Sequence, residues 1–250
     1  MQNVFDDPTL TIQSMDSIRC AAKRWRADFY ELNTIQFPKS PNPFFWDRLW
    51  VYQNFTKYNK VLVLDPDTII NSKAPNIFEE LTDDFDFCAV RDGNPGDRFP
   101  DPVYLRDSVV KHNAMLGNTI EVFEKNIKGF SREKYWQDYF NFGVTLFYPE
   151  KIMHITEKIK SLIFENSEIY TYLNFEGGGI WFSPQNFINA ILLSEDIRIK
   201  ILDNNWNWIA PDIMEEFHEN FFLGPMKPWI YHFTGTNGSK ENLKGYDRWK

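Results

Sequence analysis

The chain has 250 residues, of which 43% are hydrophobic and 25% are charged, and its formal net charge is −8. This composition is typical of a folded protein of a size that one domain can fill, and it excludes a disordered or fibrous chain. The acidic balance argues against a nucleic-acid partner, which would need a basic face, and no apolar run is long enough to span a membrane.

The N-terminal segment MQNVFDDPTL has neither a basic start nor an apolar core, so we expect no secretory signal and, by default, a cytoplasmic location. A serine N-cap followed by apolar residues at helical spacing predicts a helix over Ser14–Trp25. We expect a short strand at Asp28–Leu32 and a second amphipathic helix at about Phe44–Tyr58. The two cysteines, Cys20 and Cys88, are too few for a disulfide framework, so we expect buried, reduced thiols.

The next predicted element is the unbroken apolar run Val61–Leu64, which suits a strand covered on both faces in a parallel sheet. The long Gly/Pro-rich loop over residues 92–102 follows a strand, as ligand-binding loops do in open α/β sheets. Alternating strands and helices predict an α/β fold with a mostly parallel open sheet. The further strands are expected at Phe85–Val90, Gly143–Tyr148 and Ile197–Leu202, and the further helices near Ser108–Lys128 and Pro149–Asn166.

The strand at Val61–Leu64 leads into Asp65-Pro66-Asp67. Residues two apart on an extended chain point to the same side, and Pro66 biases Asp65 toward the extended region, so we expect the two carboxylates to converge. Two like charges so close are costly unless a cation neutralises them, and carboxylates suit Mg²⁺ or Mn²⁺. The alternative is a turn at the end of the strand or a helix cap.

The segment KVLVLDPDTII resembles the strand and Asp-x-Asp motif of nucleotide-sugar glycosyltransferases with the Rossmann-like GT-A fold, especially glycosyltransferase family 8. Other segments match motifs of that family in the same order. They are Phe45–Leu49, Tyr139–Val144 (the FNxGV strand), Pro184–Asn189 (the DQDxLN helix start), Leu202–Asn207 (the LDxxWN strand) and Trp229–Gly235 (the HFxG segment).

The resemblance implies roles for several residues. His232 would be the third metal ligand beside Asp65 and Asp67, and a nitrogen ligand would favour Mn²⁺ over Mg²⁺. Arg48 would reach the nucleotide sugar. Asn141 would line the sugar pocket, although it could instead satisfy backbone groups at the strand entrance. Gln185 would face the reacting side of the sugar, and the alternative is a solvated residue at a helix start.

The turn that follows His232 supplies a candidate site for the diphosphate. The glycines there, Gly235 among them, would permit close approach of the backbone to phosphate oxygens, and Lys240 is our candidate diphosphate lysine. A solvated tail lysine is the alternative, because the family places Lys-Pro-Trp after the histidine and this chain has it before. In addition, Pro184 replaces the aspartate expected before Gln185.

The resemblance implies a single GT-A domain over residues 1–250. Family members open with a strand that holds the nucleobase, whereas this chain starts at or after that strand. We therefore expect the first nucleotide-binding strand to be truncated: either Val4 and Phe5 are its remnant or residues upstream are missing.

The expected function is metal-dependent transfer of a sugar from a nucleoside diphosphate sugar, with a UDP-sugar as the expected donor, to a carbohydrate or other hydroxyl acceptor. By resemblance the anomeric configuration would be retained. Two alternatives stay open. One is a nucleotidyltransferase or nucleotide-sugar hydrolase that uses the same metal apparatus. The other is a carbohydrate-binding protein without catalysis.

Overall fold

The computed structural model describes residues 8–32, 43–91, 120–165, 184–209 and 228–232. Its helices are α1 (Pro8–Trp25), α2 (Pro43–Asn54), α4 (Arg132–Gln137), α5 (Pro149–Glu165) and α7 (Pro184–Ser194), the 3-10 turns η1 (Ile77–Glu79) and η3 (Asn204–Trp206), and a helical stretch over 120–126. Its strands are β1 (Val61–Leu64), β2 (Thr68–Ile70), β3 (Phe87–Arg91), β4 (Phe140–Phe147), β5 (Ile199–Ile201), β6 (Trp208–Ile209) and β7 (Ile230–His232).

The described strands form two sheets. The larger has the order β1-β4-β3-β5, with β4 antiparallel to both neighbours and β5 parallel to β3. Thus β1, β3 and β5 run in one direction and β4 alone is reversed. The smaller sheet has the order β2-β7-β6, with β7 antiparallel to β2 and parallel to β6. The predicted α/β architecture is confirmed, and the reversed β4 is the feature that apolar runs could not foretell.

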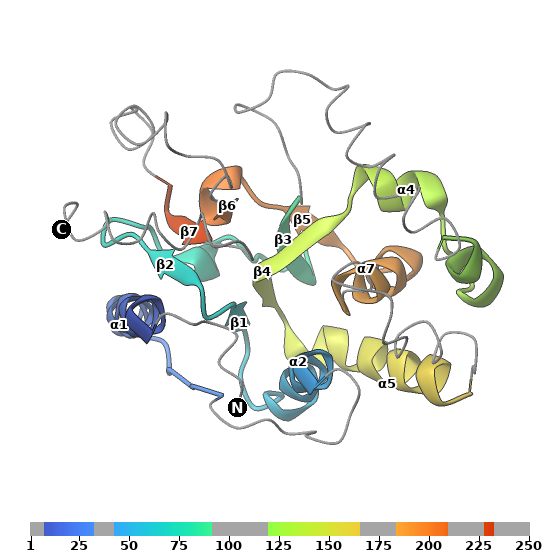
Figure 1. Ribbon diagram of the computed structural model, residues 1–250, viewed down its shortest axis with the longest axis horizontal. Coiled ribbons are helices and arrows are strands. Elements are labelled where there is room, and N and C mark those ends of the chain that lie inside the picture. The colour runs from blue at the N-terminus through green and yellow to red at the C-terminus, as the bar shows by residue number, and fades with distance from the viewer. Residues whose placement is uncertain (1–7, 33–42, 92–119, 166–183, 210–227, 233–250) are drawn as a thin grey trace.

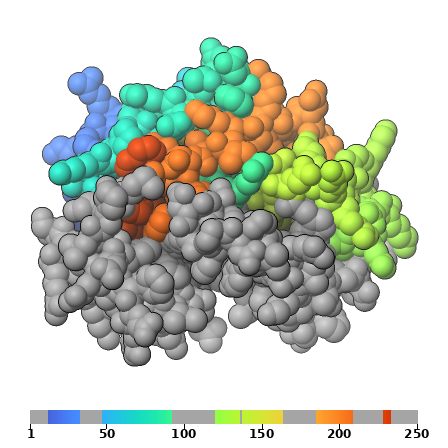
Figure 2. Space-filling view, turned by 90° about the horizontal axis from the view of Figure 1, so that it is seen from above, coloured from blue at the N-terminus to red at the C-terminus, as the bar shows by residue number. Residues whose placement is uncertain are grey.

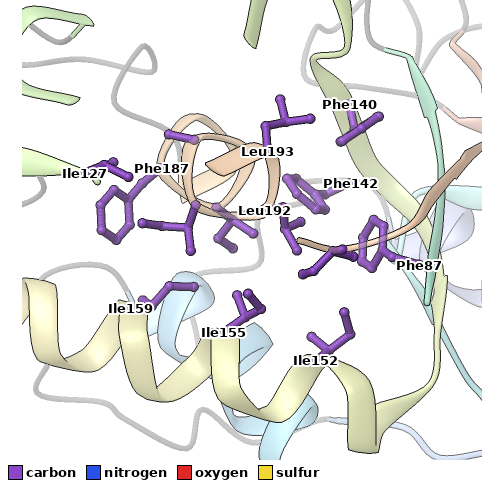
Figure 3. Packing of buried hydrophobic residues seen from close by; sticks show 14 of the residues in the cluster. Phe87, Ile127, Phe140, Phe142, Ile152, Ile155, Ile159, Phe187, Leu192 and Leu193 are labelled. Carbon is purple, nitrogen blue, oxygen red and sulfur yellow. The ribbon is translucent and has the colours of Figure 1, made fainter. Parts of the chain in front are cut away.

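The central strands β3 and β4 of the larger sheet are buried on both faces, which explains their apolar side chains. Successive residues of β3 point to opposite sides, as the period of two requires, whereas in β4 Phe142 and Val144, two residues apart, pack into the two different sides. One side packs against α2, α5 and α7, and Figure 3 shows Ile152, Ile155 and Ile159 of α5 directed at the side chains of α7 and the sheet. The other side faces α1, η3 and the smaller sheet. In Figure 1, β4 runs through the middle of the molecule, with α1 and β2 on one side and α5 and α7 on the other.

β4 departs from its ladder with β3 in the middle of the strand. The pairing Ala89↔Thr145 is followed by Val90↔Asn141, so the intervening residues of β4 bulge away from β3. β1 continues along this bulge, because the Asp65 amide donates to the Gly143 carbonyl over 2.9 Å. Bulges re-aim side chains and free backbone amides from the ladder. Those amides need other partners, which the site below supplies.

Several expectations from the sequence are corrected. Residues 28–32 form neither strand nor helix. α1 ends at Trp25 with Arg26 in a left-handed conformation (φ 56°), and the segment then runs over the surface with Tyr30 60% exposed. It pairs with no strand of the described part of the chain. Cys20 is exposed on α1, whereas Cys88 is buried as expected.

Other expected elements fall close to the observed ones or outside the described residues. The second helix ends at Asn54, before the predicted Tyr58, because a turn closes from Phe55 to Tyr58. The loop at 92–102 and the first part of the helix predicted over 108–128 lie outside the described residues. No helix in the described part of the chain is long and apolar enough to cross a membrane.

Candidate active site

The two aspartates lie on the turn that connects β1 to β2. The Thr68 amide donates to the Asp65 carbonyl over 3.1 Å and its hydroxyl donates to the same oxygen over 2.7 Å, so residues 65–68 form a β-turn. Pro66 occupies the second turn position, for which its fixed φ is suited. The predicted convergence of Asp65 and Asp67 is therefore produced by a turn and not by an extended chain. The turn and the metal hypothesis, posed as alternatives, are compatible.

His232 is delivered to this turn by the smaller sheet. β7 pairs with β2 in a register that sets His232 opposite Thr68. The imidazole is 3% exposed, and its Nε2 atom lies 3.2 Å from Asp67 Oδ1 and 3.7 Å from Asp65 Oδ2. On the face shown in Figure 2, the segment that ends in β7 (red) lies between residues 43–91 (teal) and 184–209 (orange).

The three side chains offer a donor set that a divalent cation fits. One ligand atom from each of Asp65, Asp67 and His232 lies within 4.8 Å of the other two, which approaches the spacing set by an ion about 2.1 Å from each ligand. Asp67 Oδ1 is buried and has no hydrogen-bond donor among the described residues, although His232 Nε2 is nearby. A buried carboxylate oxygen without a donor is costly, and a cation between the two atoms would satisfy both.

Arg48 of α2 fixes the other side of Asp65. Its Nη2 donates to Asp65 Oδ1 and its Nη1 donates to the Phe142 carbonyl, each over 2.7 Å. This fork ties the aspartate turn to the bulge of β4 and leaves Asp65 Oδ2 directed at His232. Burial raises the pKa of the neighbouring Tyr52 phenol, so this hydroxyl stays uncharged beside the Arg48 guanidinium.

The carboxamides of Asn141 and Gln185, which were predicted to bind sugar, accept hydrogen bonds from backbone amides in the bulge of β4. Asn141 Oδ1 accepts the Gly143 amide over 2.8 Å, and Gln185 Oε1, at the start of α7, accepts the Phe142 amide over 3.1 Å. Gln185 Nε2 also donates to the Tyr139 hydroxyl over 3.1 Å. Both residues therefore lie beside the bulge that borders the aspartate turn. The backbone role considered for Asn141 is observed, and it involves only the carboxamide oxygen and not the amide nitrogen.

Asn207 is a site residue that sequence reasoning quoted in a motif but did not assign. Its Oδ1 lies 3.0 Å from His232 Nδ1, and its Nδ2 donates to Asn141 Oδ1 over 2.9 Å. The motif expected as a strand is instead η3, capped by Asp203, with β6 directly after it. The sequence signal that could have identified Asn207 is a polar residue directly after a buried tryptophan, at the entry to a strand. Gly235 and Lys240 lie outside the described residues.

A match to a known protein family over most of the chain shows which family the chain belongs to. The family described as glycosyl transferase family 8 matches residues 3–238. The chain belongs to glycosyltransferase family 8. It is therefore an enzyme that transfers sugar, and enzymes of family 8 usually use a divalent metal. Membership implies a nucleotide-sugar donor and an acceptor, and it favours an enzyme over a carbohydrate-binding protein without catalysis.

Solved structures are similar to this family 8 chain at low sequence identity, and the first of those below shares its fold. A glycosyltransferase involved in the glycosylation of the major capsid of PBCV-1 superposes with a TM-score of 0.53 at 14% identity, covering 98% of this chain and 93% of that chain. The galactosyltransferase LgtC in complex with donor and acceptor sugar analogs gives a TM-score of 0.44 at 13% identity, over 81% and 66% of the chains. Mouse xyloside xylosyltransferase 1 gives 0.43 at 14%, over 92% and 73%. A search of curated proteins found no match.

Proposed function

We propose that this family 8 enzyme transfers a sugar from a UDP-sugar to a hydroxyl acceptor, with Mn²⁺ held by Asp65, Asp67 and His232. The observation that carries the proposal is the convergence of these three side chains around a buried carboxylate oxygen that has no donor among the residues described. The imidazole nitrogen favours Mn²⁺ over Mg²⁺, which prefers oxygen ligands.

A bound cation would supply the positive charge that stabilises the departing diphosphate. The chain's own residues hold that charge in place. Arg48 keeps Asp65 in one orientation and adds a guanidinium to the same wall of the site. In this proposal Gly235 and Lys240 contact the diphosphate from the segment after His232, where a lysine would add a second cation.

Asn141 and Gln185 are proposed to line the sugar. Both side chains are hydrogen-bonded to the bulge of β4. This supports an orientation that is fixed before the donor sugar binds, so binding costs no further freedom of the side-chain rotamers. We propose retention of the anomeric configuration. In that chemistry the acceptor hydroxyl attacks the anomeric carbon on the face that the diphosphate leaves, its proton passes to the departing phosphate, and the glycosidic bond to the diphosphate breaks.

Turnover of nucleotide sugars by Asp65→Ala and Asp67→Ala variants tests the metal site. Each variant should lose Mn²⁺-stimulated turnover, whereas Asp84→Ala, which removes an exposed carboxylate before β3, should retain it. Melting curves of the wild-type chain with and without Mn²⁺ and UDP-sugars test binding apart from turnover, because a ligand that binds only the folded state raises Tm. Full activity of either aspartate variant would overturn the proposal.

Product analysis separates the remaining rival reactions. Release of free sugar that is independent of any acceptor would favour a nucleotide-sugar hydrolase, and release of pyrophosphate from a nucleoside triphosphate would favour a nucleotidyltransferase. A glycosylated acceptor whose anomeric proton has the configuration of the donor would support retaining transfer. An inverted product would leave transfer standing and refute retention.

A further inference from the structure

The protonation pattern of the His232 ring decides whether its Nε2 atom can bind a cation. A metal ligand needs a lone pair, so in the neutral ring the proton has to reside on Nδ1. Nε2 faces the two aspartates, while Nδ1 lies 3.0 Å from Asn207 Oδ1. Whether that Asn207 atom is an oxygen or a nitrogen therefore controls the site.

The orientation of Asn207 follows from a backbone group. The Gly143 amide can only donate, so the atom of Asn141 that lies 2.8 Å from it is the carboxamide oxygen. The atom of Asn207 that lies 2.9 Å from this same oxygen must then be the NH₂ group. The Asn207 oxygen consequently faces His232, and the ring nitrogen beside it has to donate.

We propose that Asn141 and Asn207 act as an amide relay that holds the proton of His232 on Nδ1 and so presents the lone pair of Nε2 to the cation. The two asparagines are positioning residues for the ligand. The relay starts at the bulge of β4, passes through the residue after η3 and ends on β7, so it joins three segments distant in sequence. The proposed function of this relay depends on the proposed cation site.

Burial makes the relay discriminating. Asn141, Asn207 and His232 are 7%, 3% and 3% exposed, so water has little access to replace a lost partner. Turning the Asn207 carboxamide over would set its oxygen against the Asn141 oxygen and its NH₂ group against Nδ1. The two oxygens could not form a hydrogen bond, and the ring proton would have to move to Nε2. Such a buried mismatch is strongly disfavoured.

The test reads the tautomer directly in the metal-free protein. Nitrogen-15 chemical shifts of the imidazole, assigned by comparison with His232→Gln, should show a protonated Nδ1. In Asn141→Ala the Asn207 carboxamide is free to turn, so a population with the proton on Nε2 should emerge and Mn²⁺ affinity should fall about 10–100-fold. Asn141→Asp keeps an acceptor for both donors and should keep the Nδ1 proton.

Asn189→Ala is the matched control. Asn189 is also a fully buried asparagine bonded to β4, since it bridges the Phe140 amide and carbonyl, but it does not touch the relay. It should lower the melting temperature without changing the tautomer. A proton on Nε2 in the wild-type ring overturns the relay, as does an unchanged tautomer in folded Asn141→Ala. A protonated Nδ1 in a wild-type chain that binds no Mn²⁺ would support the relay and refute the proposed metal site.

Discussion

The imidazole of His232 lies against the backbone of Gly143, in the space that a side chain at that position would need. A β-carbon built on Gly143 would fall less than 3.0 Å from three ring atoms, namely Cε1, Nδ1 and Nε2. Glycine is therefore required at position 143, because the His232 ring lies directly against the backbone of β4. The G of the FNxGV motif acquires a physical meaning from this contact.

Gly143→Ala should consequently displace His232. We expect a loss of about 1–3 kcal/mol in the free energy of unfolding from overpacking, and a fall of at least about tenfold in Mn²⁺ affinity. Chemical denaturation and calorimetric titration measure the two effects. Gly129→Ala is the control: it is also strained, at φ +85° and with a β-carbon 2.8 Å from the Ser194 carbonyl oxygen, but the atoms nearest to that β-carbon all belong to Ser194 and to none of the proposed metal ligands. Unaltered Mn²⁺ affinity in Gly143→Ala would contradict the contact.

Arg48→Lys should impair the enzyme although it conserves the charge. A lysine cannot donate at once to the Phe142 carbonyl and Asp65 Oδ1 in the planar fork that arginine provides. Asp65 would gain freedom, and a misplaced ligand of this kind lowers kcat/KM by about 10–100-fold. Steady-state kinetics with Mn²⁺ and a nucleotide sugar provide the measurement. Wild-type kinetics in the lysine variant would show that charge alone suffices at position 48.

The Asp86–Arg198 pair predicts how stability depends on pH. Three hydrogen bonds from Arg198 hold the pKa of the Asp86 carboxyl below its ordinary value. Because the folded-state pKa is depressed, the contribution is complete above about pH 4, near the unfolded pKa, and is lost as pH falls through the folded value. Asp86→Asn should lower the free energy of unfolding by about 1–2 kcal/mol at pH 7, a modest figure because Arg198 is half exposed.

Urea denaturation of both proteins between pH 7 and acidic pH measures this difference. The gap in stability between wild type and Asp86→Asn should shrink as the pH falls below the ordinary carboxyl pKa. A gap that stays constant down to acidic pH would mean that the carboxylate charge contributes nothing.

The two cysteines should differ sharply in reactivity. Burial raises the pKa of the Cys88 thiol to about 12, whereas Cys20 is exposed on α1. Since the thiolate is the reacting form, a thiol reagent at pH 8 should modify one cysteine per native chain and two after denaturation. Cys20→Ser should abolish the native reaction. Rapid modification of Cys88 in the folded protein would indicate that β3 is accessible.

Much of the fold was predictable because burial leaves a direct trace in the sequence. The apolar runs at β3 and β4 are the buried central strands of the larger sheet, the run at β1 is a partly buried strand beside β4, and the period of α5 matches its buried stripe. Strand direction left no such trace. β4 is apolar whichever way it runs, so its reversal could not be read from its residues. Residues 28–32 carry strand-forming side chains, but no neighbouring strand in the described part of the chain completes a ladder.

The site was predicted by residue type and corrected in its geometry. Asp65, Asp67 and His232 do come together, although the aspartates converge through a turn. Asn207 was missed because its role depends on contacts with two segments that are remote in sequence. Hydrogen-bond direction is decided by three-dimensional neighbours, and no local pattern encodes it.

The pairing of β2 with β7 also has a kinetic consequence. Thr68 and His232 are opposite each other in the ladder, so the three proposed metal ligands come together only after the chain has closed a very long loop. Contacts of such high sequence separation are costly to form early in folding. Mn²⁺ should therefore leave the refolding rate unchanged and slow unfolding, acting as a latch that engages after the rate-limiting step.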